Sequence, residues 1–141
     1  MLRVLALFAA SALLGVAIGA RAEPAAAPHA AACVAALRAE EKTLARAVKA
    51  GDPVGGELLK VVRSGIAIIG TQYLAGLREA DARRLLKAAE EDFRTLSPAD
   101  AAERQAQCLR EGHAIYEHAS PLEQSLISTA AQRRIRKLTA T

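Results

Sequence analysis

Four residues of the chain are candidate ligands for a metal ion, namely His29, Cys33, Cys108 and His113. His29 and Cys33 are four residues apart, which places two common metal-ligand types on the same face of a helix. Cys108 and His113 would have to approach them from another part of the chain. These residues are the candidate site for a metal- or small-ligand-binding function.

The two cysteines have a second interpretation, which is a structural disulfide. The chain contains only Cys33 and Cys108, and they do not form a CxxC motif. Cysteine pairs in exported proteins usually become oxidised, because compartments outside the cytoplasm favour disulfides. We therefore favour the disulfide over the metal site. Its formation would remove both thiol ligands. The sequence therefore predicts no resident metal and no cofactor.

Residues 1–22 have the three parts of a secretory signal peptide. Arg3 is the positive charge of the first part, residues 4–18 form the apolar part, and Ala20-Arg21-Ala22 is a small-x-small cleavage site. The apolar part is shorter than the roughly 20 residues that a membrane span needs. We therefore expect a cleaved signal peptide and a mature protein that is periplasmic or secreted.

The net charge argues against one class of partner. The formal charge of +4 falls to +2 in the expected mature chain, because Arg3 and Arg21 are removed. Four positive charges lie close together near the C-terminus, at Arg133, Arg134, Arg136 and Lys137. A near-neutral domain with one basic end does not have the general basic surface of a nucleic-acid-binding protein. The basic run is instead a candidate for weak contact with an anionic membrane surface.

The rest of the chain has the pattern of an all-α protein. Apolar residues recur with helical spacing, and no stretch alternates as a β-strand does. The pattern predicts five helices at about 30–50, 57–77, 80–96, 98–118 and 121–138, or four helices and a terminal packing helix. The sequences SPAD at 97–100 and SPLE at 120–123 are strong helix starts. Residues 23–29 are expected to be a flexible lead-in, and residues 30–141 a single helical domain.

The expected helix at 57–77 is the most apolar of the five. Its apolar side chains cover roughly two thirds of the helix circumference, so several other helices must pack around it. We therefore expect a small four- to five-helix bundle with this helix at its centre. Gly65 and Gly76 lie near the middle of its apolar face, where we expect either the close approach of a neighbouring backbone or a kink.

Two charged residues fall within apolar faces and need partners or access to water. Glu40 lies in the apolar seam of the first expected helix, and Glu41 lies at the other edge of that seam. Arg134 lies within the apolar arc of the last expected helix. A buried ion pair of Arg134 with Glu40, or of Arg134 with Glu41, would satisfy both charges.

The familiar motifs of catalytic and cofactor sites are absent from the sequence. The chain contains no HExxH, P-loop, GxSxG or GxGxxG motif, and no CxxCH for covalent haem attachment. We therefore expect a non-enzymatic exported protein that acts through contacts with another exported protein. Binding of a metal or small ligand, and association with a membrane surface through the basic end, are the two alternatives.

Overall fold

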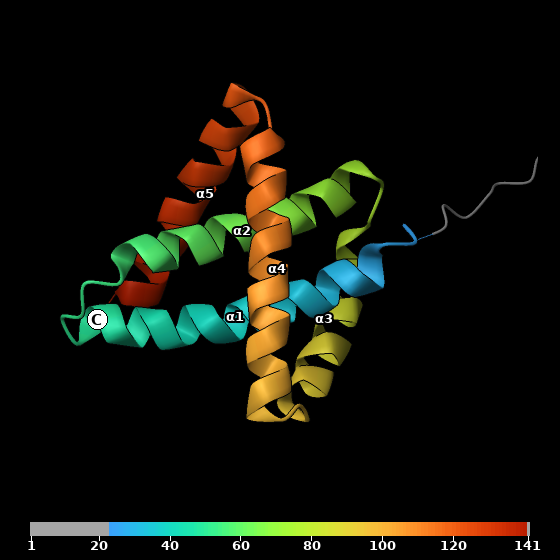
Figure 1. The fold of residues 1–141 in the computed structure, drawn as a ribbon. Coiled ribbons are helices and arrows are strands. Elements are labelled where there is room, and N and C mark those ends of the chain that lie inside the picture. The colour runs from blue at the N-terminus through green and yellow to red at the C-terminus, as the bar shows by residue number, and fades with distance from the viewer. Residues whose placement is uncertain (1–22, 141) are drawn as a thin grey trace, which may run out of the picture.

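The computed structural model describes residues 23–140, which form five α-helices and no β-strand (Figure 1). The helices are α1 (Ala27–Lys49), α2 (Gly55–Leu74), α3 (Glu79–Arg94), α4 (Pro98–His118) and α5 (Pro121–Thr139). The expected all-α class is confirmed, and the helices pack together as a small bundle. The predicted signal peptide lies outside the described residues. None of the described helices has the length and apolarity that crossing a membrane requires.

The starts of α4 and α5 are fixed by the capping residues that the sequence predicts. The side chain of Ser97 accepts a hydrogen bond from the N–H of Asp100 at the start of α4. Ser120 and Glu123 form a complete capping box at the start of α5. Each helix also has a proline at its first position, where a missing N–H leaves no bond unmade. These local interactions set the direction in which both helices leave the preceding turn.

α1 begins at Ala27, three residues before the start predicted from the sequence. Ala27 is buried and packs with Leu77 and Ala82, so tertiary contacts stabilise this additional turn. Glu23, the first described residue, forms an ion pair with Arg84 of α3 at 2.7 Å. Residues 27–29, which were expected to belong to a flexible lead-in, are therefore part of α1.

α2 ends three residues earlier than its apolar pattern predicts. Gly76 has a φ of 101°, a conformation that favours glycine. Its N–H donates to the carbonyl oxygen of Tyr73, and the N–H of Leu77 donates to that of Gln72. These two bonds are the Schellman arrangement that ends many helices. Gly76 is therefore a helix terminator, and the expectation that it is a contact point within the helix is wrong.

α1 and α2 lie side by side at the centre of the fold, and α4 crosses both of them (Figure 1). α3 packs on α1, while α5 packs on α2 and on the C-terminal part of α1. α1 thus contacts each of the other described helices, whereas α2 does not pack closely on α3. The centre of the bundle is shared by α1 and α2, and is not formed by the most apolar helix alone.

The best-buried apolar side chains lie between these two central helices. The largest are Leu37 of α1 and Leu58, Val61 and Val62 of α2. Burial of one such side chain stabilises a fold by about 1.5–3 kcal/mol. α1 also has buried alanines along its length, which let neighbouring helices come close to its backbone: Ala30, Ala31, Ala35 and Ala36. α1 therefore supplies a surface of small residues on which α3 and α4 pack.

The buried residues of α4 lie within one helical turn. Cys108 and Gly112 are its only buried residues, and they are four positions apart. Cys108 is bonded to Cys33 of α1, and Gly112 lies against Ser64 of α2. A Cβ atom at Gly112 would lie 2.5 Å from the carbonyl oxygen of Ser64. The close helix contact expected at Gly65 is therefore found at Gly112, while a Cβ at Gly65 would meet its nearest atoms at 4.0 Å.

The substitution Gly112→Ala is expected to lower the free energy of unfolding by about 2 kcal/mol, because α4 must move away from Ser64 to admit the methyl group. Gly70→Ala in α2 is the matched control, since a Cβ there meets no atom within 4 Å. It should raise stability by roughly 0.5–1 kcal/mol, because alanine loses less backbone freedom on folding. Urea titrations measure both changes, and equal effects of the two substitutions would contradict the close contact.

Candidate binding surface

The predicted disulfide between Cys33 and Cys108 is present and joins α1 to α4. Both cysteines are buried, and the bond lies in the same apolar cluster as Leu37 and Val61. Because both sulfur atoms belong to the disulfide, neither is a thiolate that could bind a metal ion. The disulfide therefore serves as a covalent link between two packed helices.

The four candidate metal ligands are only partly brought together. His29 lies 3.7 Å from the sulfur of Cys33, and its Nε2 atom lies 2.8 Å from a carboxylate oxygen of Glu111. His113 belongs to a different part of the surface, 3.9 Å from Glu117. Among the described residues the cluster is thus His29, Cys33 and Glu111, without His113. The sequence did not indicate Glu111, since an acid on an exposed helix face is common.

The predicted buried ion pair is present, but its acid is Glu41 and not Glu40. The Nε atom of Arg134 donates a hydrogen bond to one oxygen of Glu41 at 2.8 Å, and its Nη2 atom lies 2.7 Å from the same oxygen. Glu41 is 3% exposed, so its charge requires this partner. Successive helical residues point about 100° apart, and therefore only one of the two neighbouring acids can face α5.

Glu40 lies in a different environment from its neighbour. It is half-buried, and one of its carboxylate oxygens has no hydrogen-bond partner among the described residues. Removal from water raises the pKa of this carboxyl group, because burial disfavours the charged form. A raised pKa is also a feature of catalytic acids, but burial alone accounts for it at Glu40. We assign Glu40 no role in binding.

The four basic residues near the C-terminus do not form a single surface. Arg134 is turned inward to Glu41, while Arg133, Arg136 and Lys137 are exposed. The apolar residues beside them, Ile135 and Leu138, pack against the core cluster around Leu58 and Ala131. The exposed charges are thus not accompanied by the apolar face that a membrane-surface helix buries in lipid.

A cation–π contact that was not predicted from the sequence links α2 and α4, and hydrogen bonds extend it to α5. The guanidinium carbon of Arg63 lies 4.5 Å from the centre of the Tyr116 ring. The hydroxyl group of Tyr116 lies 3.0 Å from Oγ of Ser128, and Gln124 donates to the Tyr116 carbonyl oxygen. A cation–π contact of this kind contributes about 0.5–2 kcal/mol. It fixes the end of α4 and the first half of α5 over α2.

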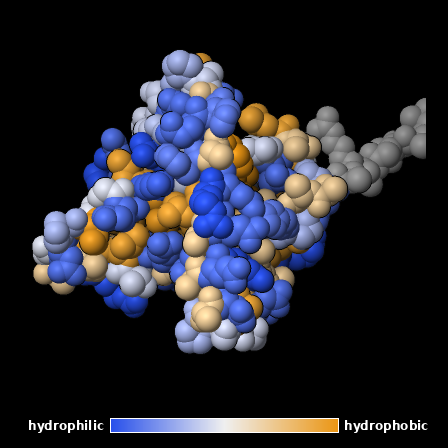
Figure 2. All heavy atoms as spheres, in the orientation of Figure 1, coloured by the Kyte–Doolittle hydropathy of each residue, from blue (hydrophilic) through white to orange (hydrophobic). Residues whose placement is uncertain are grey.

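Beyond this contact, α2, α4 and α5 diverge and leave an apolar groove of about 360 Å³. Gly70, Tyr73 and Leu74 line it from α2, Ile115 from α4, and Leu126 from α5. Figure 2 shows hydrophobic surface beside the upper part of α4, over the C-terminal end of α2. We call this region the α2–α4–α5 groove.

The large apolar side chains that are exposed within residues 23–140 gather at this groove. They are Tyr73 (45% exposed), Leu74 (84%), Ile115 (36%), Leu122 (71%) and Leu126 (61%). Four of them line the groove, and Leu122 lies one helical turn before Leu126 on α5. A single exposed leucine is ordinary, but a contiguous apolar surface around a groove is typical of a binding site.

Comparisons with protein-family models, with curated proteins and with solved structures found no match to this chain. No relative therefore assigns a role to any of these residues. The groove is the candidate functional site because of its shape, its apolar lining and the exposed side chains around it.

Arg134→Gln is expected to lower the free energy of unfolding by about 2 kcal/mol at pH 7, because it leaves the buried carboxylate of Glu41 without its partner. This is less than for a fully buried pair, since the Arg134 side chain is 36% exposed. Arg133→Gln, at an exposed neighbouring position, is the control and should change stability by less than about 0.5 kcal/mol.

The double variant Glu41→Gln/Arg134→Gln should recover most of that loss, because two neutral amides need no opposite charge. The native protein, Glu41→Gln, Arg134→Gln and the double variant form a double-mutant cycle. Thermal and urea unfolding of these four proteins measures the coupling between the two side chains. Losses that simply add in the double variant would show that the ion pair does not exist in solution.

Proposed function

We propose that this protein is an exported, non-enzymatic binding protein that holds an amphipathic helix of a second exported protein in the α2–α4–α5 groove. The main support is that four of the five exposed large apolar side chains of residues 23–140 line this one groove, and the fifth, Leu122, lies one turn before Leu126 on α5. Such a surface is unfavourable in water unless a partner covers it. Export rests on the signal-peptide pattern of residues 1–22, and the disulfide is compatible with an oxidising compartment.

The form of the groove favours a helix as its occupant. Its walls are the sides of helices, whose backbone groups are already paired within each helix. The described residues contain no strand edge to which an extended segment could be added. Binding must therefore come from the burial of side chains, as in other helix-in-groove complexes. Leu122 and Leu126 form a ridge on α5 against which apolar residues of a partner helix can pack.

The charge at the groove favours a partner helix with basic residues beside its apolar face. Glu123 is the only charged residue among those that line the groove. Hydrogen bonds with the side chain and backbone of Ser120 lower the pKa of Glu123, so it is a carboxylate at neutral pH. One exposed charge adds little affinity, but it favours one orientation of the partner over another.

A photoreactive side chain tests this proposal in the cells that produce the protein. Leu126 is replaced by p-benzoylphenylalanine, and irradiation is expected to give a discrete cross-linked adduct in the exported fraction. The same replacement at Ala88, an exposed position on α3, is the control and should give no adduct. Adding Leu74→Glu should abolish the adduct, because it places a charge in the groove. It should change the unfolding temperature little, because Leu74 is exposed.

Fragmentation of the adduct by mass spectrometry must place the cross-link on a segment of another protein with helically spaced apolar residues and flanking Lys or Arg. Capture of a protein without that segment does not support the proposal. A cross-link to a second copy of this chain would contradict it, and so would equal adducts from the Leu126 and Ala88 positions.

A further inference from the structure

A second cavity lies between α1, α3 and the C-terminal end of α2. It exists because α3 packs on α1 without closing on α2. Its volume is about 200 Å³, and its wall is mainly apolar, with Val34 from α1, Ile69 from α2, and Leu85 and Leu86 from α3. An apolar cavity of about 150 Å³ is known to bind benzene. This one therefore has room for a small ring or a short alkyl chain.

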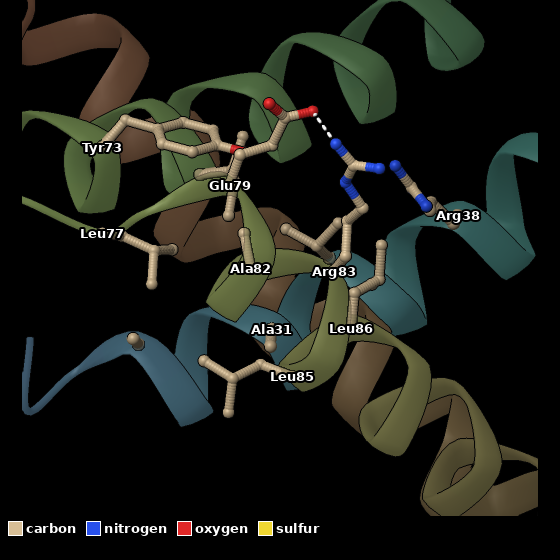
Figure 3. Close-up of a pocket in the computed structure, with 12 residues that line it drawn as sticks. Ala31, Arg38, Tyr73, Leu77, Glu79, Ala82, Arg83, Leu85 and Leu86 are labelled. Carbon is tan, nitrogen blue, oxygen red and sulfur yellow. Dashed lines mark hydrogen bonds and ion pairs between the residues drawn. The ribbon is translucent and has the colours of Figure 1, made fainter. Parts of the chain in front are cut away.

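Two arginines from different helices stand at the mouth of this cavity. Arg38 of α1 and Arg83 of α3 both line it, and Figure 3 shows their guanidinium groups turned toward each other. Two like charges in this position repel, and an anion between them would relieve the repulsion. The planar guanidinium group also matches the two oxygens of a carboxylate. The mouth of the cavity is thus suited to a carboxylate, and its wall to an apolar group.

The acidic residues beside these two arginines leave some of their N–H donors free to bind a further anion. The Nη1 atom of Arg38 lies 3.6 Å from Glu90, which is too long for a hydrogen bond. Arg83 is paired with Glu79 on its own helix, and both side chains are exposed (Figure 3). Exposed pairs of this kind contribute roughly 0–1 kcal/mol. Each guanidinium group has five N–H donors, so both can bind a further anion without losing a strong partner.

We propose that this cavity binds a small monocarboxylate with an apolar body. Its carboxylate lies between Arg38 and Arg83, and its alkyl chain or ring lies between α1, α2 and α3. A single negative charge is favoured over a doubly charged phosphate, because Glu79 also stands at the mouth and repels anions. This ligand site is distinct from the α2–α4–α5 groove that is proposed for the protein partner, although Tyr73 lines both.

Isothermal titration calorimetry of the disulfide-bonded mature protein with octanoate at pH 7 tests the proposal. Saturable binding of one octanoate is expected, with a dissociation constant of roughly 0.1–1 mM for a ligand of this size. Octan-1-ol and octylammonium have the same chain with no charge or the opposite charge, and should bind roughly tenfold more weakly. Equal affinity for octanoate and octanol, or no saturable binding of octanoate, would overturn the proposal.

Three single variants test the residues at the mouth without altering the core. Arg38→Gln and Arg83→Gln should each weaken octanoate binding roughly fivefold or more, because each removes a charged donor. Glu79→Gln should strengthen it, because it removes the competing carboxylate from Arg83. If neither arginine variant changes the affinity for octanoate, the carboxylate does not lie between them and the proposal fails.

Two further variants separate this cavity from the groove. Ala82→Leu adds a side chain to the cavity wall and should abolish octanoate binding, provided that thermal unfolding shows the variant to be folded. Leu126→Glu alters only the groove and should leave the octanoate affinity unchanged. Loss of octanoate binding in Leu126→Glu would place the ligand in the groove and overturn the proposal, whereas failure of the cross-linking experiment would not affect it.

Discussion

One helical turn of α4, from Cys108 to Gly112, joins this helix to both central helices of the fold. One end of this turn is bonded to Cys33 of α1, and the other lies against the backbone of Ser64 in α2. The disulfide prevents α4 from moving away from α1, and the missing Cβ at Gly112 allows it to reach α2. The bond joins residues 75 positions apart, and for a loop of that size the chain-entropy model predicts about 4 kcal/mol of stabilisation.

The packing of α3, α4 and α5 on the two central helices explains where the two candidate sites lie. Beyond Gly112, α4 contacts α2 again through Tyr116 and Arg63, and the groove lies beside this contact, between α2, α4 and α5. α3 packs on α1 without closing on α2. The second cavity is the space that results. Tyr73 lines both sites, so a ligand that displaces its ring would change the shape of each.

The sequence was sufficient for features that depend on local interactions, such as the all-α class and the serine-proline helix starts. It did not resolve which of two adjacent acids faces α5, because a rotation of the helix by a fraction of a turn exchanges Glu40 and Glu41. It also did not identify the groove. Leu122 and Leu126 have the spacing of a buried face, yet they are exposed. Helical periodicity shows that an apolar face exists, but not which helix packs against it.

Hydrogen–deuterium exchange tests most directly whether this turn fastens α4 to the rest of the protein. The native protein is compared with the double variant Cys33→Ala/Cys108→Ala, in which small apolar residues replace the buried cysteines. Amides of α4 (Pro98–His118) are expected to exchange roughly tenfold faster or more in the variant, because the helix opens as a local unit. The amides of α2 near Leu58 and Val62 should retain most of their protection. Unchanged protection of α4, or an equal loss in every helix, would contradict the account.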